Sequence, residues 1–147
     1  MKKPLQIVMV LVALVFVLNI TFSSNAYAVR PPELALKAIA SLASLNAALT
    51  ICFQSNEYKK LGNESAINLH RLSSRIEDLV VKIQDQYSDS RLLSGYHLLV
   101  NEHAVSQDFR IRQQEQFGSP CGSNIYTKIE SQFRDEEHSI RVVLFRN

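Results

Sequence analysis

Residues 33–60, ELALKAIASLASLNAALTICFQSNEYKK, contain the pattern that decides the fold. Apolar side chains recur there at alternating steps of three and four residues, which places them in one stripe on one face of an α-helix. The members of this stripe are Ala35, Ala38, Leu42, Leu45, Leu49 and Cys52. Lys59 and Lys60 suit the last turn of a helix, and Gly62 suits the position just after it. The sequence therefore predicts a first helix over residues 33–60.

Three further segments continue the same helical spacing, over residues 64–88, 90–114 and from 123 onward. No proline occurs between Pro32 and Pro120, and a proline inside a helix costs about 3 kcal/mol. Helices of similar length joined by short connections are typical of bundles. We therefore predict an all-α protein, a single up-down-up-down four-helix bundle. The alternative is a three-helix core with a mobile fourth element.

The first 28 residues have the form of a signal peptide. Lys2 and Lys3 precede an apolar run over residues 5–22, and Ala26-Tyr27-Ala28 matches the pattern that signal peptidase cuts. We predict cleavage after Ala28, with residues 29–147 forming the bundle in the periplasm or outside the cell. The alternative is an uncleaved membrane anchor, because about 18 apolar residues are just enough to span a bilayer. Membrane contact is expected only through this segment.

The charge of the chain argues against nucleic acid as a partner. The formal net charge of +2 comes from 16 Lys+Arg against 14 Asp+Glu, and the excess lies in Lys2 and Lys3. A nucleic-acid-binding protein needs a basic face, which a neutral chain from residue 29 onward does not offer. Five acid-before-base pairs at i,i+4 predict solvated helix faces instead: Glu33–Lys37, Asp78–Lys82, Asp108–Arg112, Glu130–Arg134 and Glu137–Arg141.

The two cysteines, Cys52 and Cys121, test the predicted topology. An alternating bundle brings both to the same end, and an exported chain favours a disulfide between them. If the first helix reached Lys60, Cys52 would lie well before its C-terminal end and therefore away from Cys121. The bond therefore requires a break near residues 55–56 or a 117–122 loop that folds down. The alternative is a reactive Cys121 thiol at a helix N-terminus.

Motifs of catalysis are missing from the sequence. It contains no GxSxG, SxxK or HExxH, so we predict a protein that is not an enzyme and uses no cofactor. The alternative function is a haem- or metal-binding bundle with histidine ligands, for which His97, His103 and His138 are the candidates. The absence of CxxCH and of Glu-x-x-His favours structural histidines.

The segment 90–114 is apolar on two sides. Leu98, Val105 and Phe109 lie opposite the stripe formed by Leu92, Tyr96 and Leu99. Such a helix either bends near residues 101–104, which turns its later side chains into the core, or is covered by a partner. We predict that Leu98, Val105 and Phe109 bind a protein partner or a second copy of the chain. The predicted function is that of an exported helical inhibitor, adaptor or chaperone-like accessory protein.

Overall fold

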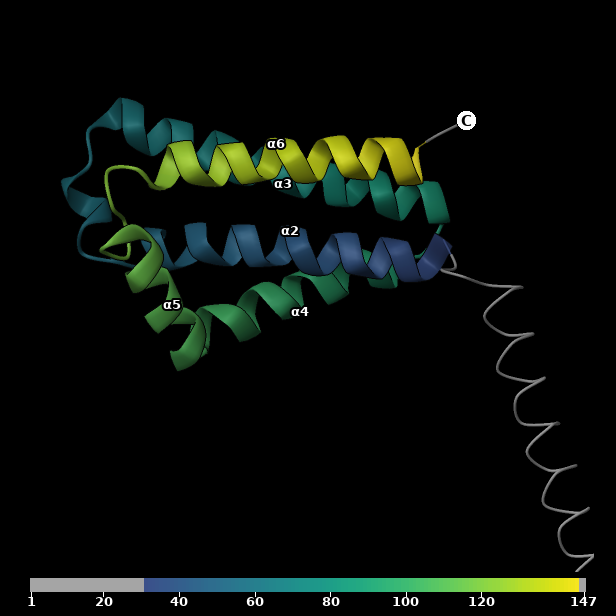
Figure 1. Ribbon diagram of the computed structural model, residues 1–147, viewed down its shortest axis with the longest axis horizontal. Coiled ribbons are helices and arrows are strands. Elements are labelled where there is room, and N and C mark those ends of the chain that lie inside the picture. The colour runs from purple at the N-terminus through teal and green to yellow at the C-terminus, as the bar shows by residue number, and fades with distance from the viewer. Residues whose placement is uncertain (1–30, 146–147) are drawn as a thin grey trace, which may run out of the picture. The chain divides into compact units, whose positions relative to one another are not determined.

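The computed structural model describes residues 31–145 and confirms the all-α prediction. This part of the chain holds five α-helices and one short 3-10 turn, labelled as in Figure 1: α2 (Pro31–Phe53), η1 (Tyr58–Lys60), α3 (Asn63–Tyr87), α4 (Arg91–Val105), α5 (Gln107–Phe117) and α6 (Ile125–Leu144). The bundle belongs to the unit Leu34–Asn147, one of two into which the chain divides. The apolar run and the cleavage site after Ala28 lie outside the described residues.

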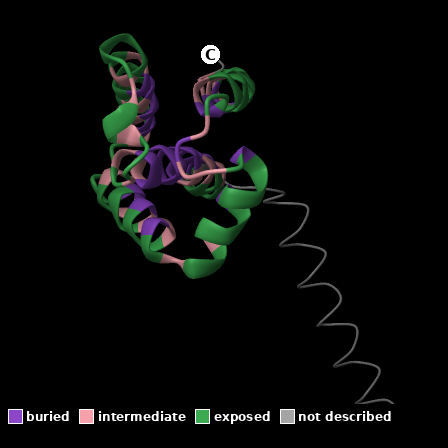
Figure 2. Cartoon of the chain, turned by 90° about the vertical axis from the view of Figure 1, so that its left-hand side faces the viewer, coloured by how far each residue is buried: buried purple, intermediate pink, exposed green. Residues whose placement is uncertain are grey.

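Helix α2 is the central helix of the bundle. Helices α3 and α6 run along one side of it and α4 and α5 along the other (Figure 1). Directions alternate through α2, α3, α4 and α6, as the predicted topology requires, whereas the short α5 runs at an angle to the rest. Viewed along the helices, buried residues gather around α2 and on the sides of its neighbours that face it (Figure 2).

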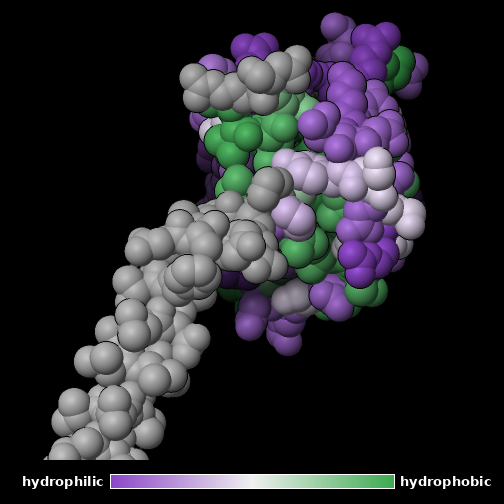
Figure 3. Space-filling model, turned by 90° about the vertical axis from the view of Figure 1, so that its right-hand side faces the viewer, coloured by the Kyte–Doolittle hydropathy of each residue, from purple (hydrophilic) through white to green (hydrophobic). Residues whose placement is uncertain are grey.

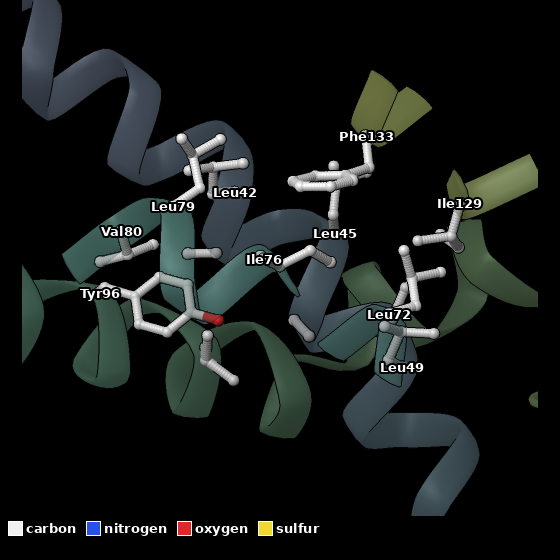
Figure 4. Packing of buried hydrophobic residues seen from close by; sticks show 14 of the residues in the cluster. Leu42, Leu45, Leu49, Leu72, Ile76, Leu79, Val80, Tyr96, Ile129 and Phe133 are labelled. Carbon is white, nitrogen blue, oxygen red and sulfur yellow. The ribbon is translucent and has the colours of Figure 1, made fainter. Parts of the chain in front are cut away.

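The core forms because α2 is apolar on almost every side, while its neighbours each contribute one apolar stripe. Leu42, Leu45 and Leu49 of α2 contact side chains from three other helices (Figure 4). Those side chains are Leu72, Ile76, Leu79 and Val80 of α3, Tyr96 of α4, and Ile129 and Phe133 of α6. Figure 3 shows hydrophobic side chains exposed at the end of the unit where α2 begins and α6 ends. The large hydrophobic residues exposed there are Leu36, Val142 and Val143.

Within residues 31–145, one helix is long and apolar enough to cross a membrane, over Pro32–Phe53. In the most apolar 18-residue stretch of this helix, however, 61% of the residues are buried inside the bundle. Burial of this kind is what the core helix of a folded domain shows. The composition of α2 is therefore accounted for by its central position.

The first helix ends at Phe53, so the prediction that it continues to Lys60 is wrong. The reason is a local turn built on Ser55. Its backbone N–H donates to the Cys52 carbonyl at 3.0 Å and its hydroxyl donates to the same oxygen at 2.6 Å. The Ser55 hydroxyl also accepts from the Tyr58 N–H at 3.3 Å. These bonds replace the helical ones, as serine commonly allows.

The segment predicted as one helix over residues 90–114 is divided at Ser106, so the predicted count of four helices is also wrong. Ser106 has an extended backbone, with φ −70° and ψ 122°, which ends α4. Its hydroxyl then accepts from the Phe109 N–H at 3.3 Å and caps the start of α5. The bend falls just after the 101–104 region considered from the sequence.

Cys52 and Cys121 form the predicted disulfide, with their Cα atoms 4.5 Å apart. Both residues are buried. The bond joins the last turn of α2 to the connection between α5 and α6, and the early end of α2 at Phe53 removes the geometric conflict. A disulfide indicates an oxidising compartment.

Candidate functional site

Two adjoining hollows lie along one side of α2. The first has a volume of about 370 Å³ and is lined by residues of α2, α4, α5 and α6. The second shares Ser44, Leu45 and Gln132 with it and continues between α2 and α6. We call them together the α2 groove. Its lining residues are Ala40, Ser41, Ser44, Leu45, Ala48, His103, Phe109, Arg112, Gln113, Gln116, Phe117, Ile129, Gln132, Asp135 and Glu136.

Small side chains of α2 make the groove possible. Ser44 lies four residues after Ala40 and three after Ser41, so both pairs share a face of α2, and all three residues are at least partly accessible. Larger side chains at these positions would fill the space between α5 and α6. A ligand bound in the groove can therefore lie close to the backbone of α2.

The end of the groove at α5 combines an aromatic wall with basic groups. Phe109 is half-buried, and the His103 ring stacks on it with centroids 4.8 Å apart. The guanidinium carbon of Arg112 lies 6.0 Å from the centroid of the same ring. Phe109 thus has a guanidinium cation and an imidazole ring beside it, a combination suited to an anion that carries an apolar group.

Gln113 lies at the buried side of this end and is 3% exposed. Its Nε2 donates to the Ala48 carbonyl at 2.9 Å and to the Pro120 carbonyl at 3.1 Å. An exchange of the amide oxygen and nitrogen would set Oε1 against two carbonyl oxygens, so these bonds fix the orientation of the amide. Among the buried side-chain nitrogen and oxygen atoms of residues 31–145, only Gln113 Oε1 has no hydrogen-bond partner.

The opposite end of the groove is acidic. Asp135 and Glu136 of α6 line the second hollow, with Gln132 between them and the α5 end. The groove therefore runs from basic groups at α5 to carboxylates on α6. Such a gradient favours one orientation of a polar or charged ligand.

The structure separates the three residues predicted to bind a partner. Leu98 and Val105 lie on the outer side of α4, where they are 61% and 78% exposed. Phe109 follows the break at Ser106 and packs against the core, where it lines the groove. The three side chains therefore do not form one continuous stripe, and only Phe109 belongs to the groove.

The three histidines considered as ligands lie in different surroundings. His97 is exposed, with its Nε2 3.9 Å from Glu77 Oε1, and His138 is exposed on α6, whereas His103 is half-buried in the groove. Over the range 31–145, no group of three or more His, Cys, Asp or Glu side chains is placed to hold a metal ion.

The fourth histidine, His70, has a structural position outside the groove. Its ring stacks on Phe53 with centroids 4.3 Å apart, and its Nε2 is 2.6 Å from the Tyr58 hydroxyl. These contacts attach the turn after α2 to α3. His70 therefore holds the turn that follows α2 against α3.

Gln113 is the site residue that the sequence prediction missed. It lies four residues after Phe109 and four before Phe117, so it occupies an otherwise apolar stripe of α5. A polar side chain at such a position is a sign of a buried hydrogen-bonding group. This spacing could have identified it.

Comparison with known proteins finds no matching family model, no matching curated sequence and no matching solved structure. The function is therefore inferred from the groove itself.

Proposed function

We propose that this chain is an exported, non-enzymatic binding protein that holds a segment of a partner protein in the α2 groove. The observation that carries the proposal is the open side of the central helix. Helices α3, α4 and α6 cover the other sides of α2, whereas the side between α5 and α6 is hollow over more than one helical turn, from Ala40 to Ala48. A helix or extended segment of a partner would fill this place, in the manner of peptides bound in grooves.

Export is proposed from the N-terminal sequence together with the disulfide. Residues 1–28 have the features of a signal peptide, and Cys52–Cys121 suits an oxidising compartment. The periplasm or the extracellular space meets both conditions. The partner is then expected in the same compartment.

The chemistry of the groove supports binding rather than catalysis. Ser44 and His103 line the same hollow, yet no hydrogen bond joins them, and the ring contact of His103 is with Phe109. An activated serine needs a base within hydrogen-bond reach and a third group that orients that base. Neither is provided by the described residues of the groove.

A crosslinking experiment in the cells that make the protein tests this function. A photo-reactive phenylalanine analogue replaces Ser44 in the groove or, as a control, the exposed Lys82 on α3. The expected result is one discrete adduct at position 44 and none at position 82. The partner is then purified, and Ser44→Trp, which fills the groove, should abolish its binding while leaving the thermal midpoint within a few degrees.

The outer face of α4 is the alternative docking surface. The double substitution Leu98→Asp with Val105→Asp changes two exposed side chains and should leave partner binding intact. Loss of binding in this variant, with normal binding by Ser44→Trp, would move the interface from the groove to α4.

A further inference from the structure

We infer that the outer face of α4 is a dimerisation surface, on which a second copy of this chain packs its own α4 in the antiparallel direction. The outer face consists of Arg91, Gly95, Leu98, Glu102 and Val105, and it lies on the side of α4 that is turned away from the core (Figure 1). This surface is separate from the α2 groove. The inference therefore goes beyond the proposed function and does not depend on it.

The residues of the outer face repeat in the way that the seam of a helix pair does. From Arg91 to Val105 they follow one another at steps of four, three, four and three residues, which places them in one stripe along the helix. The buried stripe of α4, with Leu92 and Tyr96, lies on the opposite side. Leu98 is 61% and Val105 78% exposed, so the described part of the chain leaves the outer face uncovered.

Gly95 forms a notch in the middle of the outer face. Glycine is among the least favourable residues inside a helix. A Cβ atom added at position 95 would meet no neighbouring atom within 4 Å, so packing inside the chain does not require glycine there. A glycine on an exposed helix face lets another helix approach closely. The Leu98 side chain of a second copy would occupy this space.

The antiparallel register follows from two equal spacings. Leu98 lies seven residues after Arg91, and Glu102 lies seven residues after Gly95. When Leu98 of one copy packs on Gly95 of an antiparallel second copy, Arg91 of the first copy therefore lies opposite Glu102 of the second. Twofold symmetry repeats both contacts, which closes the assembly as a dimer.

The charges of the outer face are complementary in this register. Glu102 is exposed and makes no ion pair with any residue in the range 31–145. The Arg91 side chain is 87% exposed, and its Nε and Nη2 donate to Asp89 at 3.0 and 2.9 Å. These bonds hold the guanidinium group in place and leave three of its five N–H donors for another carboxylate. A parallel pair would instead set like charges against each other, so the charges favour the antiparallel second copy.

Sedimentation velocity tests the dimer on protein produced from the full-length gene, with its disulfide intact. A single pair of 15-residue helices is smaller than a standard interface of about 1,600 Å², so we expect a Kd on the order of 100 µM. Gly95→Leu fills the notch and should weaken the dimer at least about tenfold. Its thermal midpoint should stay equal or rise, because leucine favours a helix more than glycine does. The control Ser74→Leu, at an exposed position of α3, should dimerise like the unchanged protein.

An exchange of charges tests the register. Arg91→Glu and Glu102→Arg should each weaken the dimer about tenfold, because like charges then face each other. Both substitutions in one chain should restore the Kd to within about threefold of its original value. The control Asp78→Arg, at an exposed acid of α3, should have no effect.

Two results would overturn the inference. One is a protein that stays monomeric at concentrations about tenfold above the expected Kd. The other is a dimer that the double charge exchange does not restore. A dimer that survives Gly95→Leu but is lost in Ser44→Trp would also refute the outer face of α4, and it would place the second copy in the α2 groove.

Discussion

Asn46 and Tyr96, 50 residues apart in the sequence, share a hydrogen bond inside the core, with Asn46 Nδ2 donating to the tyrosine hydroxyl. Asn46 Oδ1 in turn accepts from the Ser73 hydroxyl at 2.7 Å. One buried amide therefore connects α2, α3 and α4. Because hydrogen bonds depend on direction whereas apolar contacts do not, this group fixes how the three helices are turned toward one another.

Asn46→Ala should lower the free energy of unfolding by about 2–3 kcal/mol, since it leaves a small cavity and removes the partner of the buried Tyr96 hydroxyl and of the half-buried Ser73 hydroxyl. Urea unfolding followed by circular dichroism measures the loss. Ser41→Ala, at a half-buried position of the same helix, should change stability by less than about 0.5 kcal/mol. Equal effects of the two substitutions would show that the Asn46 hydrogen bonds contribute nothing.

Stability should fall at high pH because of Tyr96. Burial raises the pKa of Tyr96 from 10.0 to about 12, with the hydrogen bond from Asn46 opposing the shift and the nearby charge of Glu77 adding to it. Below pH 10 the Tyr96 phenol is neutral in both the folded and the unfolded chain, so its contribution to the free energy of unfolding is fully present there. Between pH 10 and 12 the phenol ionises in the unfolded chain but not in the folded one, so stability decreases as pH rises.

Urea midpoints measured from pH 8 to 12 check this expectation. Tyr96→Phe should be less stable at pH 8 by about 1 kcal/mol and should depend less on pH above 10. The other titrating groups are present in both proteins, so the difference between the two curves belongs to Tyr96. Parallel curves would contradict the assignment.

Reduction of Cys52–Cys121 should destabilise the fold by about 4 kcal/mol on the chain-entropy model, because the bond closes a loop of 69 residues. Unfolding with and without reductant measures the difference. The double variant Cys52→Ala with Cys121→Ala should be insensitive to reductant. If the unreduced native protein could be alkylated at Cys52 or Cys121, that residue would be a free thiol, which would contradict the structure.

Ser106→Ala should destabilise the protein by about 1 kcal/mol, because the cap at the start of α5 is lost. Ser106→Asp retains an oxygen that can accept from the Phe109 N–H and should keep nearly full stability. Chemical denaturation of both variants tests the cap. Similar losses in the two would assign the effect to something other than the hydrogen bond.

The long helices were predictable because their apolar residues repeat over many turns. The stripe over residues 64–88 corresponds to α3, and the last segment to α6. Two predicted ion pairs, Glu130–Arg134 at 2.8 Å and Glu137–Arg141 at 3.3 Å, are present on α6. The repeat of apolar residues and the spacing of charged pairs depend on one helix at a time, so both can be read from the sequence alone.

The breaks and the groove depend on contacts that a periodic pattern does not contain. The Ser55 hydroxyl bonds to the Cys52 carbonyl and the Tyr58 N–H where α2 ends, whereas Ser106 ends α4 through its extended backbone and caps α5 with its hydroxyl. The sequence predicts Phe109 as a partner-contact residue and offers His103 only as an alternative haem or metal ligand, whereas their meeting with Gln113 depends on the angle of α5. That angle follows from the break at Ser106.

The disulfide also has a consequence for how the groove forms. Cys121 directly follows Pro120, whose carbonyl holds the Gln113 amide. Oxidation therefore fixes the same short stretch of chain that positions the base of the groove. While Cys52 and Cys121 are reduced, the chain lacks this restraint, so formation of the bond would complete the groove as well as the bundle.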